Sequence, residues 1–155
     1  MRNQFLLRAV EIAIDNVRNN SGGPFGALVV KDGKILAEGV NRVTSTNDPT
    51  AHAEIVAIRN ACQHLQSFEL NDCEIYTSCE PCPMCLSAIY WSRASRIIYG
   101  ASRQDAAAAG FDDEFLYHEV VSPHSNRSIP IEQIHREEAL ATFNEWRNQN
   151  GKTLY

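Results

Sequence analysis

Residues 74–99 read EIYTSCEPCPMCLSAIYWSRASRIIY, and this stretch decides the fold. Residues 74–78 and 96–99 are rich in apolar, β-branched and aromatic side chains, which is typical of short strands. Between them, residues 83–92 suit a helix that is entered through prolines. Because the crossover is helical, the two strands are predicted to lie parallel in one sheet that helices cover.

Upstream, the sequence predicts a helix and a hairpin that extend this sheet. Residues 3–19 carry apolar side chains at helical spacing, and the turn-forming residues that follow end the helix. Residues 27–30 and 34–38 flank Asp32–Gly33, a pair that suits a tight antiparallel turn. We therefore expect an α/β fold, a three-layer α/β/α sandwich with a mixed central sheet covered by helices.

The segment between the hairpin and the decisive stretch predicts a loop followed by a helix. Residues 41–50 are rich in Asn, Thr, Ser and Pro, which is typical of a loop. Residues 51–63 are dense in Ala and Ile, and Asp48 or Thr50 is placed to cap this second helix. The helix is expected to begin at His52.

The pattern weakens toward the C-terminus. Residues 105–109 predict a short helix, 111–130 a loop with polar residues and Pro, and 137–148 a further helix. The polar tail over 148–155 has no periodicity that places it.

Length and composition predict a single globular domain over residues 1–155. The chain is 44% hydrophobic and 21% charged, both ordinary values for such a domain. It has no apolar run long enough to cross a membrane, and charged residues interrupt its N-terminal helix, so we expect neither a membrane span nor a secretory signal but a cytoplasmic protein. Five cysteines, an odd set without an export signal, favour free thiols or metal ligands over a disulfide framework.

The net charge indicates which kinds of partner the chain can bind. At −5, with a sequence pI near 5.5, the chain should repel a polyanion, and it has no run of Lys and Arg interleaved with aromatics. A small neutral substrate is therefore expected, and no nucleic-acid partner.

The candidate metal-binding and catalytic residues lie in two short motifs. His52–Ala53–Glu54 and Pro81–Cys82–Pro83–Met84–Cys85 together form the H-x-E and P-C-x-x-C pattern that is typical of zinc-dependent base deaminases. One imidazole and two thiolates, from His52, Cys82 and Cys85, would hold one Zn²⁺ per chain and leave a fourth position for water. Glu54 is then expected to take a proton from that water, protonate a ring nitrogen and later the departing amine.

Other interpretations of these cysteines remain. A Cys-x-x-Cys pair is often a redox dithiol or half of a structural zinc site, and a Glu at a helix start often only favours the helix dipole. A closed structural site needs a fourth ligand, for which Cys79 is the nearby candidate. Three residues before Cys82, Cys79 is more typical of a small buried thiol that ends a strand.

These motifs lie in longer segments that resemble a known family. The segments are GGPFGALVV at 22–30, STNDPTAHAEI at 45–55, YTSCEPCPMCLSAIYWS at 76–92 and AGFDDEF at 109–115. With them the sequence resembles the cytidine deaminase-like superfamily, and within it the bacterial guanine deaminases, over nearly the whole chain. The resemblance implies zinc-dependent hydrolysis of guanine to xanthine and ammonia.

The resemblance also implies which residues hold the base. Phe25 and Trp91 would enclose its plane, Asn41 would bond its polar edge, and Asp113 with Tyr155 would close the pocket and select the substrate. Each has a structural alternative: Phe25 and Trp91 as core residues, Asn41 as a turn former, and Asp113 as a helix cap.

Finally, the resemblance implies a homodimer in which about residues 136–155 reach the partner's active site. Other activities stay open: deamination of another base or nucleoside (guanosine, cytosine, cytidine), deamination of adenosine in tRNA, and a non-catalytic zinc-stabilised binding module. The tRNA activity needs a basic surface that an acidic chain does not offer.

Overall fold

The computed structural model describes residues 2–111 and 113–155; Asp112, in the segment AGFDDEF, lies outside them. The chain divides into two compact units, Met1–Glu114 and Phe115–Tyr155, where the sequence predicted one domain over 1–155. The first unit contains the whole sheet, and the second contains mainly helices.

The first unit is built on a mixed sheet with the strand order β2-β1-β3-β4. β1 pairs antiparallel with both β2 and β3, whereas β3 and β4 pair in parallel, as the helical crossover between them predicted. The strands are β1 Gly26–Lys31, β2 Lys34–Val40, β3 Cys73–Cys79 and β4 Arg96–Ala101.

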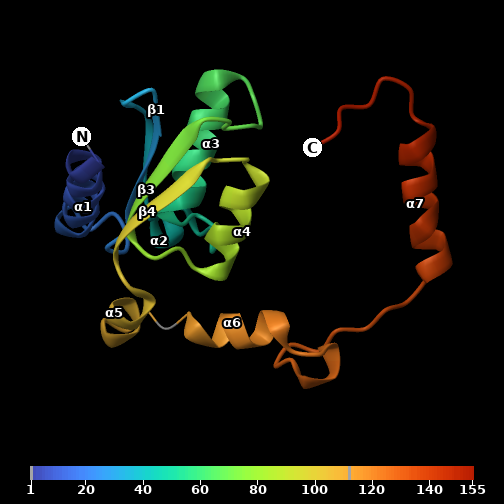
Figure 1. The fold of residues 1–155 in the computed structure, drawn as a ribbon. Helices are drawn as coiled ribbons and strands as arrows, with labels where there is room; N and C mark the ends of the chain where they lie inside the picture. Colours follow the sequence, from blue (N-terminus) through green and yellow to red (C-terminus); the bar gives the residue numbers. More distant parts are fainter. Residues whose placement is uncertain (1, 112) are drawn as a thin grey trace. The chain divides into compact units, whose positions relative to one another are not determined.

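Helices cover both faces of the sheet (Figure 1). α1 (Arg2–Arg18) packs Phe5, Ala9 and Ile12 on one face. α3 (Ala53–Leu65) and α4 (Pro83–Trp91) cover the other face, where their apolar residues share a core with those of β1 and β3. The predicted three-layer α/β/α sandwich is confirmed.

The close packing of α3 on β2 depends on small residues. A Cβ on Gly39 would meet the carbonyl oxygen of Ala53 and the backbone nitrogen of Ala57. Ala53, Ala57 and Ala61 are fully buried along this helix. The helix therefore lies directly on the sheet, and its first residues are fixed at one end of the strands.

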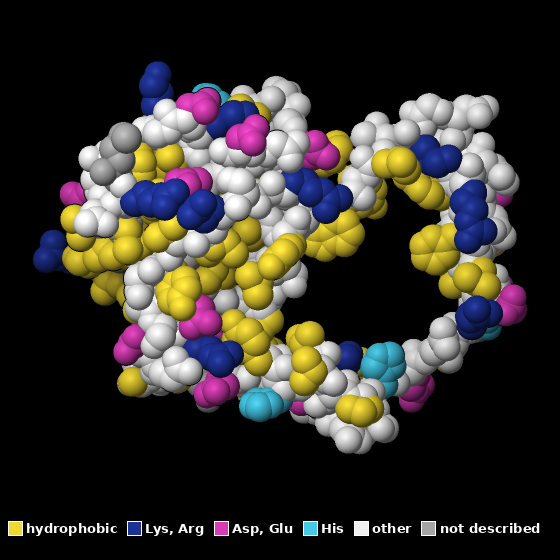
Figure 2. Space-filling view, in the orientation of Figure 1, with side chains coloured by type: hydrophobic (Ala, Val, Ile, Leu, Met, Phe, Trp, Pro, Cys, Tyr) yellow, Lys and Arg dark blue, Asp and Glu magenta, His cyan; other side chains and the backbone are white. Residues whose placement is uncertain are grey.

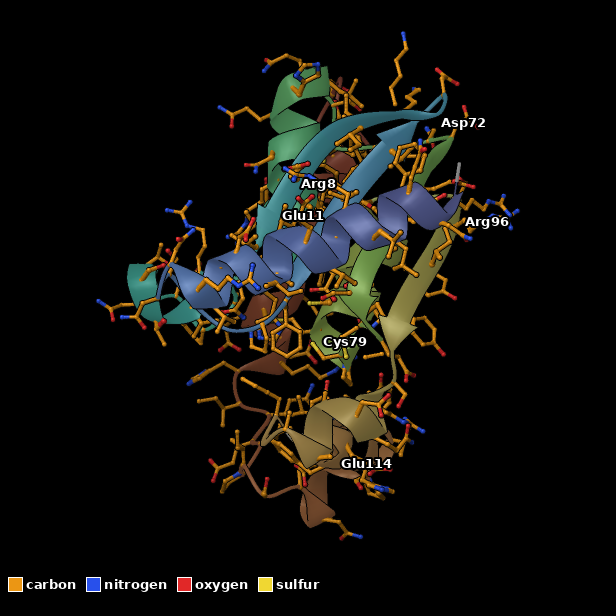
Figure 3. All side chains as sticks on the ribbon, turned by 90° about the vertical axis from the view of Figure 1, so that its left-hand side faces the viewer. Arg8, Glu11, Asp72, Cys79, Arg96 and Glu114 are labelled. Atoms are coloured by element: carbon orange, nitrogen blue, oxygen red, sulfur yellow. The ribbon has the colours of Figure 1, made fainter. Side chains whose placement is uncertain are left out.

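At this end of the sheet lie the carboxyl ends of β3 and β4. Figure 3 shows Cys79 at this end and Asp72 and Arg96 at the opposite end. In sheets of this kind, ligands bind beyond the carboxyl ends of parallel strands. On the outer side, Figure 3 also shows Arg8 and Glu11 on α1, where Arg8 Nη1 lies 2.7 Å from Glu11 Oε2 and Arg8 Nε lies 2.8 Å from Glu38 Oε1 on β2.

Two local predictions were wrong between β2 and α3. A short helix, α2 (Val43–Thr46), lies within the predicted loop over 41–50. The N-cap of α3 is His52, with extended backbone angles, and neither Asp48 nor Thr50 caps the helix. Asp48 Oδ1 instead accepts hydrogen bonds from the backbone and hydroxyl of Thr50, at 2.8 and 2.7 Å, so these two residues form their own turn.

The segments after β4 are helical over more of their length than predicted. α5 (Arg103–Ala108) and α7 (Arg136–Asn148) correspond to the two predicted helices. α6 (Glu114–Val121) lies within the predicted loop over 111–130, because its apolar residues follow a helical pattern for only two turns before Pro123. Neither α6 nor α7 has a buried residue, and no helix in the described part of the chain is long and apolar enough to cross a membrane.

Gly39→Ala tests the close packing of α3. The added methyl group would press against the helix backbone, so we expect a loss of about 1–3 kcal/mol or more in the free energy of unfolding in urea. At Gly23 a Cβ would have its nearest neighbour, Asn41 Cγ, at 3.4 Å, so Gly23→Ala is the matched control with little expected change. Equal stability of the two variants would contradict this account of the packing.

Candidate active site

The N-termini of two helices bring three metal-binding groups together at the carboxyl end of β3. His52 is the N-cap of α3, Cys82 is the N-cap of α4, and Cys85 lies in the first turn of α4 behind Pro83. Their ligand atoms all lie within 4.8 Å of one another. His52 Nδ1 faces both sulfur atoms, at 3.6 Å from Cys82 Sγ and 3.5 Å from Cys85 Sγ.

This geometry fits zinc. With Zn–N and Zn–S bonds of ordinary length and tetrahedral angles, the nitrogen and sulfur ligands of one zinc ion are separated by about 3.6 Å. The two measured N···S separations match that value. Imidazole and thiolate are also the donors that zinc prefers, so the chemistry and the spacing of the group agree.

The electrostatics of the group favour a thiolate. Cys85 and His52, both within hydrogen-bonding range, hold the pKa of the Cys82 thiol well below its ordinary value. The same contact with Cys82, together with burial, raises the pKa of Cys85, and contact with Cys82 raises the pKa of His52. Metal binding releases protons from such a group, because the thiolates and the neutral imidazole are the ligand forms.

Glu54 lies beside the three ligand candidates, on the first turn of α3, and is 6% exposed. Burial raises the pKa of its carboxyl group. Thr77 on β3 donates a hydrogen bond to Glu54 Oε1 over 3.3 Å. A carboxylate that is buried next to a metal site, and that is not a member of the ligand group, is placed to accept and return protons.

Cys79 ends β3 as a buried thiol, as its position in the sequence predicted. Burial raises its pKa to about 11, and its thiol group lies 3.6 Å from the carbonyl oxygen of Ser102. It is not a member of the three-ligand group. The group therefore does not close into a four-ligand structural site among the described residues.

A cavity of about 600 Å³ opens over this group, within the size range of small-molecule sites. The residues that line it include six that were predicted to bind metal or base or to act in catalysis: His52, Glu54, Cys82, Phe25, Asn41 and Asp113. All belong to the first unit.

Asn41 is held by the loop before β1. Its side-chain oxygen accepts hydrogen bonds from the backbone N–H groups of Gly23 and Val43, both over 3.3 Å. The Asn16 side chain in turn donates to the carbonyl oxygens of Gly23 and Asn41, both over 2.9 Å. The amide of Asn41 is thereby oriented, with its nitrogen as the group that can donate to a ligand.

Two aromatic rings form one wall. Phe25 and Phe111 meet edge to face, with ring centroids 5.0 Å apart, and both line the cavity. Sequence reasoning gave no role to Phe111, which also lies in the segment AGFDDEF, or to Glu80, which stands inside the zinc motif. The segment around Phe111 is one of those on which the predicted substrate rests, and the structure places both Phe111 and Glu80 on the cavity.

Of the other residues predicted to contact the base, Trp91 belongs to the first unit and Tyr155 to the second. Trp91 is not among the residues that line it and is 63% exposed. The cysteines occupy the N-terminal turn of α4, whereas Trp91 is the last residue of that helix, so the two ends face different surroundings. Tyr155 belongs to the second unit, where it is 74% exposed and its ring lies 6.4 Å from that of Trp146.

The cavity is acidic. Glu54, Glu80 and Asp113 line it, and no Lys or Arg does so among the described residues. Across the face shown in Figure 2, Lys and Arg of the first unit are interspersed with Asp and Glu and do not gather in one basic patch. Neither the cavity nor this face has the charge that phosphate groups require.

Known proteins resemble this chain in both sequence and structure. Residues 1–101 match the family described as the cytidine and deoxycytidylate deaminase zinc-binding region. The guanine deaminase of Bacillus subtilis is 55% identical over 151 residues, 97% of each chain. An X-ray structure of guanine deaminase from Bacillus subtilis, 54% identical, has a TM-score of 0.98 and covers 100% of this chain and 99% of its own.

A more distant relative is the tRNA-specific adenosine deaminase of Haemophilus influenzae, 42% identical over 101 residues, which are 61% of this chain and 58% of that protein. This likeness covers part of each chain and not the full length. With a family match over most of its length and a full-length relative, the chain belongs to the cytidine and deoxycytidylate deaminase zinc-binding family.

Proposed function

We propose that this chain is a zinc-dependent deaminase that hydrolyses guanine to xanthine and ammonia. The observation that carries the substrate is the extent of its likeness to the guanine deaminase of Bacillus subtilis, which spans 97% of both chains and so continues beyond residue 101, where the zinc-binding region ends. That added stretch contains Phe111 and Asp113, which line the cavity.

In this proposal His52 Nδ1, Cys82 Sγ and Cys85 Sγ hold one zinc ion per chain. Their spacing and their donor chemistry support the assignment. When bound, zinc supplies a Lewis acid that makes water nucleophilic at neutral pH. The positive ends of α3 and α4 both favour the anionic groups at this point.

Glu54 moves the protons. It takes one from the attacking water and delivers it to the ring nitrogen beside the carbon that bears the amino group. As that proton moves, the water oxygen bonds to the carbon that bears the amino group. Glu54 then takes the second proton, from the oxygen that has been added, and passes it to the amino group. The C–N bond breaks as the C=O bond forms, and ammonia leaves. A carboxyl group whose pKa burial has raised suits a step that needs both its basic and its acidic form.

The rest of the cavity binds the base. Phe25 and Phe111 contact its plane, the Asn41 amide donates to an acceptor on its edge, and the Asp113 carboxylate accepts from an N–H on another edge. A neutral base with both donors and acceptors on its rim suits these groups. A phosphorylated substrate would be repelled by the three carboxylates.

Deamination of adenosine in tRNA is the second candidate, since the tRNA-specific adenosine deaminase of Haemophilus influenzae is 42% identical over 101 residues. The acidic cavity and the chain's net charge of −5 argue against a polyanionic substrate. The same chemistry would also deaminate guanosine, cytosine or cytidine. A non-catalytic zinc-binding module, in contrast, would not need a buried Glu54.

The proposal includes a homodimer in which about residues 136–155 reach the partner's cavity. The second unit supports it, because most of its large apolar side chains are exposed and it has no buried residue among those described. A segment of that size cannot bury a core by itself, so it needs a partner surface. Tyr155, and Trp91 on the surface of α4, would then contact a site composed of two chains.

A cytoplasmic location is also part of the proposal. All five cysteines are free thiols, which suits a reducing compartment.

Cys82→Ala tests the metal site. The variant retains two of the three ligands, so zinc measured by atomic emission should fall from about one ion per chain to well below half of that value. Cys79→Ala removes a neighbouring buried thiol outside the ligand group and should keep its zinc. Full zinc content in Cys82→Ala would disprove the assignment.

Ammonia release from guanine, guanosine, cytosine, cytidine, adenine and guanosine monophosphate tests the substrate. We expect turnover of guanine and none of the phosphorylated compound, because the cavity is acidic. Glu54→Gln keeps the shape of the side chain but not its base, and should lower kcat at least about 10²-fold with zinc retained. Turnover of a different base alone would refute guanine as the substrate, and an active Glu54→Gln would refute the role of Glu54.

Complementation tests the exchanged tail. Deletion of residues 149–155 should remove most activity without lowering the melting temperature, because these residues leave the sheet intact. Co-expression of this deletion with inactive Glu54→Gln should restore about a quarter of wild-type activity, since half of random dimers would be mixed and have one complete site. If each chain closed its own site, the mixture would stay inactive.

A further inference from the structure

Thr77 is a polar residue in an apolar row. It lies on β3 in register with Ala27 of β1, and it is 1% exposed. Side chains alternate along a strand, so Thr77 shares a face with Cys73 and Ile75, which pack in the core under α3. Valine has nearly the same shape as threonine and would suit this row without a hydroxyl group to satisfy.

The hydroxyl group of Thr77 has a specific partner. It donates to Oε1 of Glu54 over 3.3 Å, from the sheet to the first turn of α3. Threonine is branched at Cβ and has few side-chain rotamers, so the strand backbone fixes the position of its hydroxyl group. Glu54 has the opposite character, with three rotatable bonds and a carboxylate that can turn.

The other contacts of the Glu54 carboxylate do not replace this bond when zinc is held. Its own backbone N–H group is in hydrogen-bonding range but belongs to α3 and does not connect the carboxylate to the sheet. The Cys85 thiol also lies within hydrogen-bonding range of the Glu54 carboxylate. Cys85 is one of the three proposed zinc ligands, and a sulfur that binds zinc as a thiolate has no proton to donate. The Thr77 hydroxyl keeps its proton in either state.

We propose that Thr77 is a positioning residue for deamination: its hydroxyl group holds one oxygen of Glu54 so that the other faces the attacking water and the ring nitrogen. This inference rests on the proposed function of Glu54. It assigns Thr77 no contact with substrate or metal, so its loss should lower the rate of the chemical step and leave binding of the base unchanged.

The test compares Thr77→Val, which removes the hydroxyl group and keeps the shape, with Thr77→Ser, which keeps the hydroxyl group. Ser92→Ala is the matched control, because Ser92 is also buried and its hydroxyl group donates to the carbonyl oxygen of Ile89 over 2.8 Å, at the far end of α4. For each protein, kcat and KM are measured with the base that the wild type deaminates, together with zinc per chain and the dissociation constant of 8-azaguanine by calorimetry.

We expect kcat of Thr77→Val to fall about tenfold or more, since small misplacements of a catalytic group cost that much. KM, the 8-azaguanine constant and zinc content should stay within about twofold of the wild type, as should kcat of Ser92→Ala. Thr77→Ser should recover most of the lost rate. Thr77→Ala, which adds no volume, replaces Thr77→Val if the latter does not fold.

Wild-type kcat in Thr77→Val, a loss that Thr77→Ser does not restore, or a loss that follows zinc content would each overturn the positioning role. A wild-type protein that releases no ammonia from any base would overturn the proposed function instead. The two failures are therefore distinguishable in one set of measurements.

Discussion

The direct packing of α3 on the sheet is the constraint on which the site depends. Gly39 and the buried alanines of α3 let the helix backbone lie on β2, so the start of the helix is fixed at the sheet's edge. There His52 faces the cysteines at the start of α4. With larger residues at this contact, the helix would stand away from the sheet, and His52 Nδ1 would not keep a ligand's distance from both sulfur atoms.

The sequence was sufficient for the parts of the fold that repeat a local pattern. The hairpin followed from Asp32–Gly33, and the parallel pairing of β3 with β4 followed from the helical crossover between them. The cap of α3 could not be predicted in the same way. Asp48 and Thr50 are both favoured caps, but they bond to each other, and His52 takes the N-cap position through its backbone alone.

The residues of the candidate site show the same difference between what a local pattern predicts and what only the fold reveals. The ligand group followed from the spacing of His52, Cys82 and Cys85, because that spacing has a chemical meaning wherever it occurs. Phe111 and Thr77 carry no such signal in the sequence. Phe111 joins the site through its ring contact with Phe25, and Thr77 through its hydrogen bond to Glu54, from the sheet to the helix layer. Trp91 shows the converse: it lies in a family motif, yet it does not line the cavity of the first unit and is 63% exposed.

The meeting of two helix starts also has a consequence for folding. A zinc ion held by His52 and Cys82 would join residues 30 positions apart in sequence and so close a loop that contains α3 and β3. Closing that loop removes conformations that the unfolded chain would otherwise have. The metal thus acts as a cross-link of the tertiary structure as well as a catalyst, and the free energy of zinc binding becomes part of the free energy of folding. Turnover and thermal stability are therefore coupled through one ion, and a substitution that changes either has to be interpreted with its metal content known.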